Sequence, residues 1–225
     1  MELEPKLIRR HLEEQIVKLV PIEQPWIDES RSSFLDGSLP DERLAELGWE
    51  PADLDLHLRR PEALRRFAKQ RFAPGLEERF LASKGSRDLV IYSLLRVRDY
   101  ALARELWIRL EEDETTFAEA ARQFGEGPEA DRQGVIGPIP IGALQPPLLQ
   151  EVLRGLKAGE MSPPIGLGEW QLLLRLEKLT PSRLDESVRD QMIQESLDQF
   201  LDERVSKILA GEGDSLEPFH YDPES

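Results

Sequence analysis

Residues 153–165 of the chain read LRGLKAGEMSPPI, and this stretch joins a helical pattern to a strand pattern. Apolar residues recur at helical spacing from Leu148, just before the stretch, to Leu156 within it. Gly159 can adopt the left-handed conformation that ends a helix. After the stretch, apolar and polar residues alternate, which predicts a strand. We therefore predict a helix, a turn closed by Gly159, and a strand whose apolar positions are Trp170, Leu172, Leu174 and Leu176.

Residues 89–97 contain a second strand pattern, LVIYSLLRV, which begins with β-branched and aromatic residues. A continuous apolar run of this length suits a central strand that is covered on both faces. Two helices are predicted to follow, over residues 100–110 and 117–124, because apolar residues recur there at helical spacing. Residues 125–147 are rich in glycine and proline, so we predict a loop with one short apolar stretch.

Both ends of the chain are predicted to be helical. Residues 1–86 contain several short amphipathic helices, and apolar residues from Leu184 to Ile208 mark one long helix. Each of these helices must bury its apolar stripe, so we expect the two ends to pack together. The fold class is therefore α+β: a small central sheet flanked by helices, residues 87–179, is inserted in an all-α module of residues 1–86 and 180–211. Residues 212–225 are predicted to be an acidic, flexible tail.

Four segments resemble motifs of the parvulin-type peptidylprolyl cis-trans isomerases. FAEAARQF at residues 117–124 resembles the helix F-x-x-L-A-x-x-x-S of that family, and QGVIG at 133–137 resembles its turn G-G-D-L-G. Residues 153–165 are similar to its segment A-L-x-x-G-E-x-S-x-P-V, and EWQLL at 169–173 stands where the family has G-Y-H-I-I. The resemblance implies a parvulin-like domain over residues 87–179. The flanking helices are similar in layout to the SurA-like periplasmic chaperones.

The resemblance also implies an apolar pocket for a proline side chain. Ile136, Leu144 and Leu148 match the positions where the family builds this pocket, and Gln145 keeps a family-like polar group. Leucines at helical spacing are more often part of a hydrophobic core, so both interpretations of these leucines stay open.

The polar side chains that the family uses in catalysis are substituted in this chain. The positions of its two histidines hold Ser93 and Gln171, and the position of its cysteine or aspartate holds Gly127. No histidine lies between His57 and His220, so no shift of the alignment recovers one. Ser93 and Gln171 are neutral residues that can keep a hydrogen bond across the sheet.

These substitutions weaken the case for an enzyme without removing it. Rotation about an X-Pro bond has a barrier of roughly 18–20 kcal/mol and needs no proton transfer or nucleophile. A thousandfold acceleration requires about 4 kcal/mol of preference for the twisted amide. An apolar pocket with one or two hydrogen bonds can supply part of that preference.

Three functions are therefore compatible with the sequence. The first is a chaperone or assembly factor that binds unfolded, extended or proline-containing segments, with weak or absent isomerase activity. The second is an active isomerase that works through the apolar pocket. The third is a scaffold that binds an acidic protein through a basic stretch, for which the alternative interpretation is a solvated helix face. This stretch runs from Arg59 to Arg71 and contains Arg59, Arg60, Arg65, Arg66, Lys69 and Arg71.

The composition of the chain disfavours several classes of binding partner and of catalytic chemistry. A formal net charge of −15 disfavours binding to nucleic acid or anionic membranes. The chain has no cysteine, and His11, His57 and His220 show no spacing typical of metal ligands. We therefore expect no metal and no cofactor. The first residues are acidic and no long apolar run occurs, which predicts no membrane insertion and a cytoplasmic protein.

Overall fold

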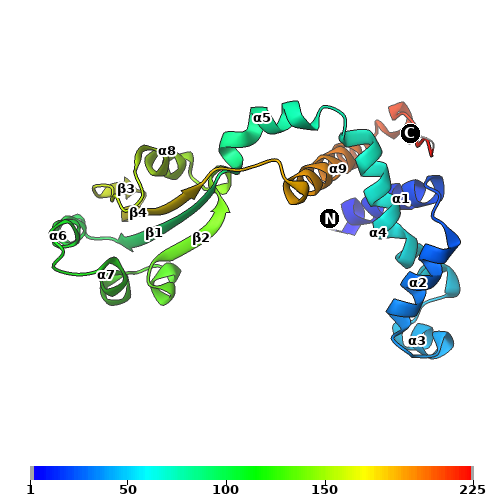
Figure 1. Cartoon of the computed structure of the whole chain (residues 1–225), viewed down its shortest axis with the longest axis horizontal. Helices are drawn as coiled ribbons and strands as arrows, with labels where there is room; N and C mark the ends of the chain where they lie inside the picture. Colours follow the sequence, from blue (N-terminus) through cyan, green and yellow to red (C-terminus); the bar gives the residue numbers. More distant parts are fainter. Residues whose placement is uncertain (1–2, 224–225) are drawn as a thin grey trace. The chain divides into compact units, whose positions relative to one another are not determined.

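The computed structural model describes residues 3–223, which form two compact units (Figure 1). The helical unit contains the chain up to Glu78 and from Leu184 onward, and the mixed unit contains Arg79–Arg183. The prediction of an α+β chain with a mixed domain inserted in an all-α module is confirmed. The structure divides the chain after Glu78 and Arg183, whereas the sequence-based division was after residues 86 and 179.

The helical unit is built around the mutual packing of α1, α4 and α9. Each of these helices buries one apolar stripe, and Ile16, Phe67 and Leu201 from the three helices are at most 1% exposed. The two ends of the chain therefore share one core. The helices of this unit are α1 (Leu3–Leu19), α2 (Gln24–Leu35), α3 (Pro40–Leu47), α4 (Pro51–Phe72), α9 (Glu186–Leu209) and the short η3 (Gly213–Ser215).

A buried carboxylate joins the three central helices. Glu13 of α1 is 4% exposed, accepts a hydrogen bond from Arg9 and pairs with Arg60 of α4. Arg9 also donates a hydrogen bond of 2.6 Å to Asp202 of α9. A buried charge is tolerated only when it is paired, so these contacts fix the helices relative to one another within the unit.

The mixed unit contains a four-stranded antiparallel sheet in the order β2-β1-β4-β3. The two strands predicted from the sequence, β1 and β4, are the central pair. Helix α5 begins in the helical unit and ends in the mixed one. The strands are β1 (Leu89–Val97), β2 (Val135–Pro140), β3 (Ile165–Leu167) and β4 (Trp170–Thr180). The helices are α5 (Leu76–Arg87), α6 (Tyr100–Glu111), α7 (Phe117–Phe124), η1 (Pro128–Arg132), η2 (Ile141–Ala143) and α8 (Pro147–Gly155).

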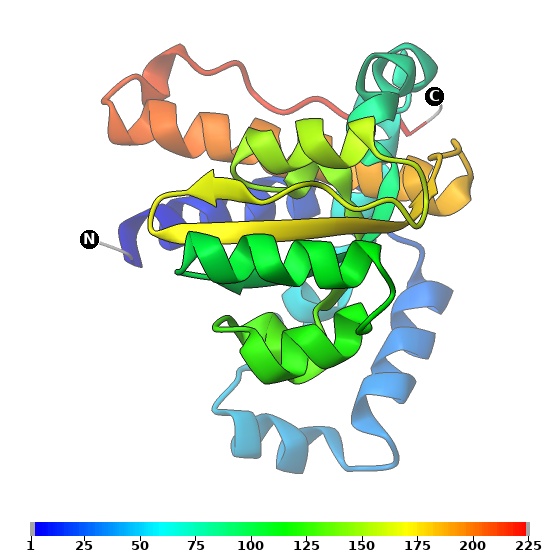
Figure 2. The same ribbon diagram turned by 90° about the vertical axis from the view of Figure 1, so that its left-hand side faces the viewer.

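The sheet buries a hydrophobic cluster on each of its two faces. One face carries Tyr92, Leu94 and Leu174 and packs against η2 and α8, and we call it the α8 face. The other face carries Leu95 and Leu173 and packs against α6 and α7. Figure 2 shows α8 on one side of the sheet and the other two helices on the opposite side. Because both faces of β1 are covered, its sequence is apolar at nearly every position.

Two local predictions were wrong. Gly159 has a left-handed φ of 85°, but it lies in the turn after α8, which ends at Gly155 and is followed by extended Leu156. Residues 125–147 are more ordered than the predicted loop, because they contain β2 and two short 3-10 helices. Prolines and Gly137 interrupt the alternating pattern of β2, and this hid the strand in the sequence.

The segment after α9 contacts the helical unit. The aromatic ring of Phe219 packs against Phe67 of α4 and Phe200 of α9. These contacts give the tail a defined place, and its flexibility stays a prediction. None of the helices among residues 3–223 is both long enough and apolar enough to span a membrane.

Most of the basic stretch in α4 faces carboxylates of the same unit. Arg66 pairs with Glu23, at 2.6 Å, and with Glu62, at 2.7 Å. Its guanidinium, through this hydrogen bond, lowers the pKa of Glu23 to about 2. Arg59, Arg60 and Arg65 also have partners, so the stretch is largely compensated.

The pairing of Glu23 with Arg66 should make the folding stability of the protein depend on pH in the acidic range. A carboxylate whose pKa is depressed on folding stabilises the folded state fully above its ordinary pKa of 4.5, and this contribution is lost as pH falls toward about 2. The melting temperature of Glu23→Gln should therefore lie below that of the wild type at neutral pH and converge with it near pH 2. A difference that is unchanged at pH 2 would show that Arg66 is not paired with Glu23.

Candidate functional site

The residues of the expected proline pocket lie on or near the α8 face, but they differ in exposure. Leu144 is 5% exposed and belongs to the hydrophobic cluster, so the core interpretation holds for this leucine. Ile136 of β2 is partly buried against the same cluster. Leu148, on the first turn of α8, is 37% exposed, and Gln145 is also exposed. The structure thus joins Ile136 and Leu144 in one cluster and leaves Leu148 and Gln145 to contact solvent or a ligand.

Ser93 and Gln171 do not share a hydrogen bond, so that prediction was wrong. Strand register places Ser93 opposite Arg175 and Gln171 opposite Val97. Because Val97 is four positions along β1 from Ser93, the two polar residues are about 13 Å apart along the strand. Ser93 is 1% exposed and donates its hydrogen bond to Glu177 instead.

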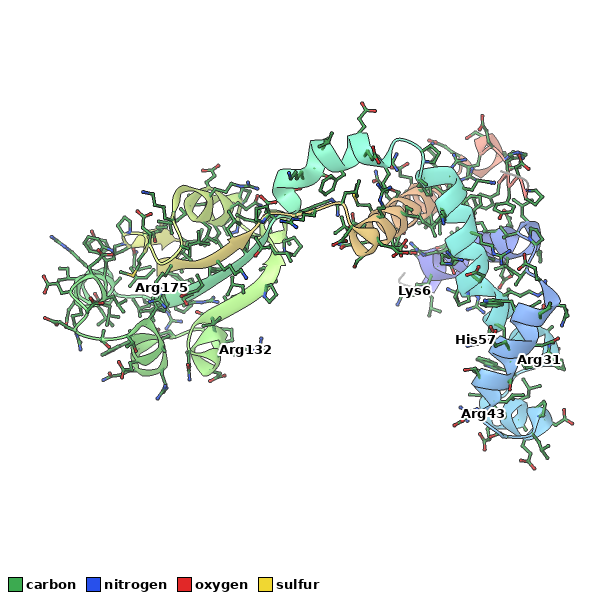
Figure 3. All side chains as sticks on the ribbon, in the orientation of Figure 1. Lys6, Arg31, Arg43, His57, Arg132 and Arg175 are labelled. Atoms are coloured by element: carbon green, nitrogen blue, oxygen red, sulfur yellow. The ribbon has the colours of Figure 1, made fainter. Side chains whose placement is uncertain are left out.

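The surroundings of Ser93 form a closed structural cluster. Arg175, labelled in Figure 3, donates a hydrogen bond of 2.8 Å to Glu177 and lies 5.1 Å from the ring centroid of Phe117 in α7. Ser93 alternates with the residues of the α8 face, so it lies on the opposite side of the sheet from Tyr92 and Leu94. Ser93 therefore supports the packing of α7 and does not face the predicted pocket.

Gly127 lies beside an ion pair that the sequence did not reveal. Arg96 of β1 donates two hydrogen bonds of 2.6 Å to the two carboxylate oxygens of Glu129 in η1. Glu129 is 6% exposed. A Cβ atom at Gly127 would collide with both of these side chains. A side chain at this position, such as the cysteine or aspartate that the resemblance implies, would therefore require the ends of Arg96 and Glu129 to move.

Further charged groups and an indole ring surround this ion pair. The guanidinium of Arg96 lies 5.9 Å from the ring centroid of Trp170, and that of Arg98 lies 4.6 Å from it. Burial, followed by the charge of Glu129, raises the pKa of the Tyr92 hydroxyl. Hydrogen bonding to Glu129 raises the pKa of Arg96. We call Arg96, Glu129 and Trp170 the Arg96 cluster.

One feature of the sequence indicates this cluster. Arg96 is the single charged residue in the strand LVIYSLLRV, and a charge in a covered strand requires a partner. The sequence does not show that this partner is Glu129, because 33 positions separate the two residues.

The charged and aromatic groups of the Arg96 cluster suit contacts with a ligand better than acid–base catalysis. Arg96 and Glu129 are each satisfied by the other through two hydrogen bonds, which leaves neither directed at a substrate proton. Within residues 3–223, no group of three or more histidine, cysteine or carboxylate side chains is arranged to hold a metal ion. His57, labelled in Figure 3, packs against the rings of Phe34 and Trp49 in the helical unit.

The fold and these motifs define a class of domain. Residues 96–178 match the family model described as the PPIC-type PPIase domain of the rotamases. The mixed unit therefore contains a parvulin-type peptidylprolyl isomerase domain, and the resemblance predicted from the motifs is confirmed. No curated protein sequence matches the chain.

The whole chain is similar to solved structures of PrsA. PrsA from Bacillus anthracis is 16% identical, with coverage of 96% of this chain and 100% of that one and a TM-score of 0.51. PrsA from Bacillus cereus is also 16% identical, with coverage of 98% and 85% and a TM-score of 0.52. Foldase protein PrsA from Streptococcus pneumoniae is 13% identical, with coverage of 95% and 84% and a TM-score of 0.50. The chain thus shares the PrsA fold, including a helical module around the parvulin-type domain.

A side chain at position 127 should lower the free energy of unfolding of the mixed unit only while the Arg96–Glu129 ion pair is present. Gly127→Ala should destabilise the mixed unit by about 1–3 kcal/mol, because the new methyl group displaces Arg96 or Glu129. In the double variant Arg96→Leu, Glu129→Leu, the same change should cost less than about 0.5 kcal/mol. Hydrogen exchange of β1 and β4 amides measures both differences. Equal costs in the two backgrounds would show that the pair does not exclude a side chain at this position.

Proposed function

We propose that this chain is a chaperone that binds extended or proline-containing polypeptide segments and has weak or absent isomerase activity. One observation carries the proposal: the Arg96–Glu129 ion pair stands beside Gly127, where the family places a catalytic side chain. Apolar side chains remain near that pair on the α8 face. The domain thus keeps a surface for a peptide and lacks the polar groups associated with turnover.

The available apolar surface suits binding better than catalysis. Ile136 and Trp170 are partly exposed, and Leu148 is 37% exposed. Covering such a surface gains about 25 cal/mol per Å² of apolar area. Leu144 is buried in the core and cannot line a deep pocket in this conformation. A shallow surface binds the planar and the twisted amide almost equally, and uniform binding does not accelerate the reaction.

The names of the structural relatives bear on both the chaperone and the isomerase candidates. The Bacillus proteins are named peptidylprolyl isomerases, and the Streptococcus protein is named a foldase. The match of residues 96–178 to the isomerase family favours a second candidate, a working isomerase that acts through the apolar surface. The substitution of both histidine positions, by Ser93 and Gln171, favours the chaperone.

The finer predictions about partners and location remain open to test. An acidic protein bound at Arg59–Arg71 stays a prediction, and four of the six cations there already contact carboxylates of the same unit. The cytoplasmic location also stays a prediction.

The proposal predicts that Leu148 contributes to binding of an unfolded client. The full chain at equimolar concentration should at least halve the light scattering of an aggregating unfolded protein. Leu148→Arg should lose most of this effect, because a charge would be placed in the apolar contact.

Leu179→Arg is the matched control, since Leu179 of β4 has the same 37% exposure and lies near the far end of the strand from Trp170. It should keep the activity of the wild type. If Leu148→Arg suppresses aggregation as well as Leu179→Arg does, the α8 face is not the binding surface.

A further inference from the structure

The segment at residues 216–223 lies along the helical unit without regular secondary structure (Figure 1). Side chains from two helices hold its backbone. Arg204 of α9 donates a hydrogen bond of 2.6 Å to the carbonyl oxygen of Glu217. Gln70 of α4 accepts a hydrogen bond of 3.0 Å from the backbone N–H of Asp222 and donates one to the Asp222 carbonyl. These contacts recognise an extended peptide backbone and do not depend on the side chains of the segment.

One aromatic side chain anchors the segment. The ring of Phe219 meets Phe67 edge-on, with centroids 5.6 Å apart and an interplanar angle of 85°. It lies 6.0 Å from the ring of Phe200, and the guanidinium of Arg204 lies 4.4 Å from its centroid. A ring held by two aromatic edges and a cation is selected over an aliphatic side chain of similar size.

The surface under the segment carries excess positive charge. Arg71 and Arg204 both stack on Phe200, with centroid distances of 4.5 and 4.8 Å. Among residues 3–223, neither guanidinium has a carboxylate within salt-bridge distance. Burial, and then the charge of Arg71, lower the pKa of Arg204, and Glu217 of the segment opposes this effect.

We propose that this surface is a peptide-binding groove, occupied here by the chain's own tail in place of a segment of another polypeptide. The groove is defined by Phe67, Gln70, Arg71, Phe200 and Arg204. It fits an extended segment that carries a phenylalanine, because the tail makes backbone and ring contacts of these kinds, and the two guanidiniums without a salt-bridge partner among residues 3–223 favour an acidic segment. This inference goes beyond the proposed function, since it places a second binding site on the helical unit and requires nothing of the parvulin-type domain.

The tethered tail controls access to the groove. Residue 219 follows the end of α9 by ten positions, so the tail competes at an effective concentration of about 1 mM. A partner with the affinity of the tail therefore binds weakly until the tail is released. The groove is thereby reserved for segments that bind better than the tail or are present at high local concentration.

The test uses the full chain and a fluorescein-labelled peptide with the sequence of residues 213–223, GDSLEPFHYDP. Fluorescence anisotropy should show binding to Phe219→Ala that is at least about tenfold tighter than binding to the wild type, because the competing ring is gone. Glu217→Arg places a cation beside Arg204 and removes no packed side chain, so it should produce the same gain.

Further substitutions in the Phe219→Ala background identify the groove. Gln70→Ala should weaken binding of the peptide about tenfold, because the backbone contacts are lost. Gln199→Ala is the matched control: this glutamine is exposed on α9, and its side chain donates a hydrogen bond to Glu203. It should leave the affinity unchanged.

Two results would overturn the inference. One is equally weak binding of the peptide by the wild type, Phe219→Ala and Glu217→Arg, while circular dichroism shows that all three are folded. The other is equal binding of a peptide in which the phenylalanine is replaced by alanine. Either result would show that the tail only packs against the helical unit and does not occupy a peptide-binding site. Neither would bear on the aggregation assay of the α8 face, because that assay depends on Leu148 of the mixed unit.

Discussion

The ion pair between Arg96 and Glu129 decides what the parvulin-type domain can offer a peptide. An arginine in a covered strand needs a carboxylate partner, and a partly buried pair is costly to break from either side. Its side chains fill the space in which a residue at position 127 would place its Cβ atom, so any residue other than glycine requires the ends of these two side chains to move. The pair as it stands and a side chain at position 127 compete for the same space. Glycine at position 127 therefore accords with the packing of Arg96 against Glu129.

Ser93, at one of the two positions where the resemblance implies a histidine, has a structural role. Ser93 is buried and satisfied by Glu177, which is held by Arg175 beneath α7. This cluster stabilises the side of the sheet opposite Tyr92 and Leu94. Ser93 therefore helps to hold the sheet and α7 together. What remains for a ligand is the apolar α8 face and the aromatic and charged groups of the Arg96 cluster.

The sequence predicted the elements whose patterns are local. The ends of β1 and of α7 were predicted correctly, because β1 is a short apolar run and α7 lies between a Thr116–Glu119 capping box and Gly125. The strand β2 was missed because glycine and proline interrupt it, and β3 was missed because it has only three residues. The pairing of Ser93 with Glu177 depends on strand register and on a bulge between Ile91 and Tyr92, which periodicity does not encode. Glu129 and the tail contacts join residues distant in sequence and could not be predicted.

The two units offer chemically different surfaces for polypeptides. The mixed unit presents apolar and aromatic side chains, whereas the helical unit presents two guanidiniums and a cluster of phenylalanine rings. In a chain with a net charge of −15, an acidic segment is repelled on average, and the groove supplies local attraction within about 10 Å, the Debye length at moderate salt. The surfaces therefore suit different parts of an unfolded client.

The central claim is that the parvulin-type domain holds a peptide without rotating its prolyl bond. Exchange spectroscopy by nuclear magnetic resonance tests this directly, with the full chain and a short peptide that contains one alanine–proline bond. We expect the amide signals of Gly127 and Trp170 to shift as peptide is added, while cis–trans exchange of the peptide is accelerated less than about tenfold. Acceleration of more than about a hundredfold under the same conditions would contradict the account.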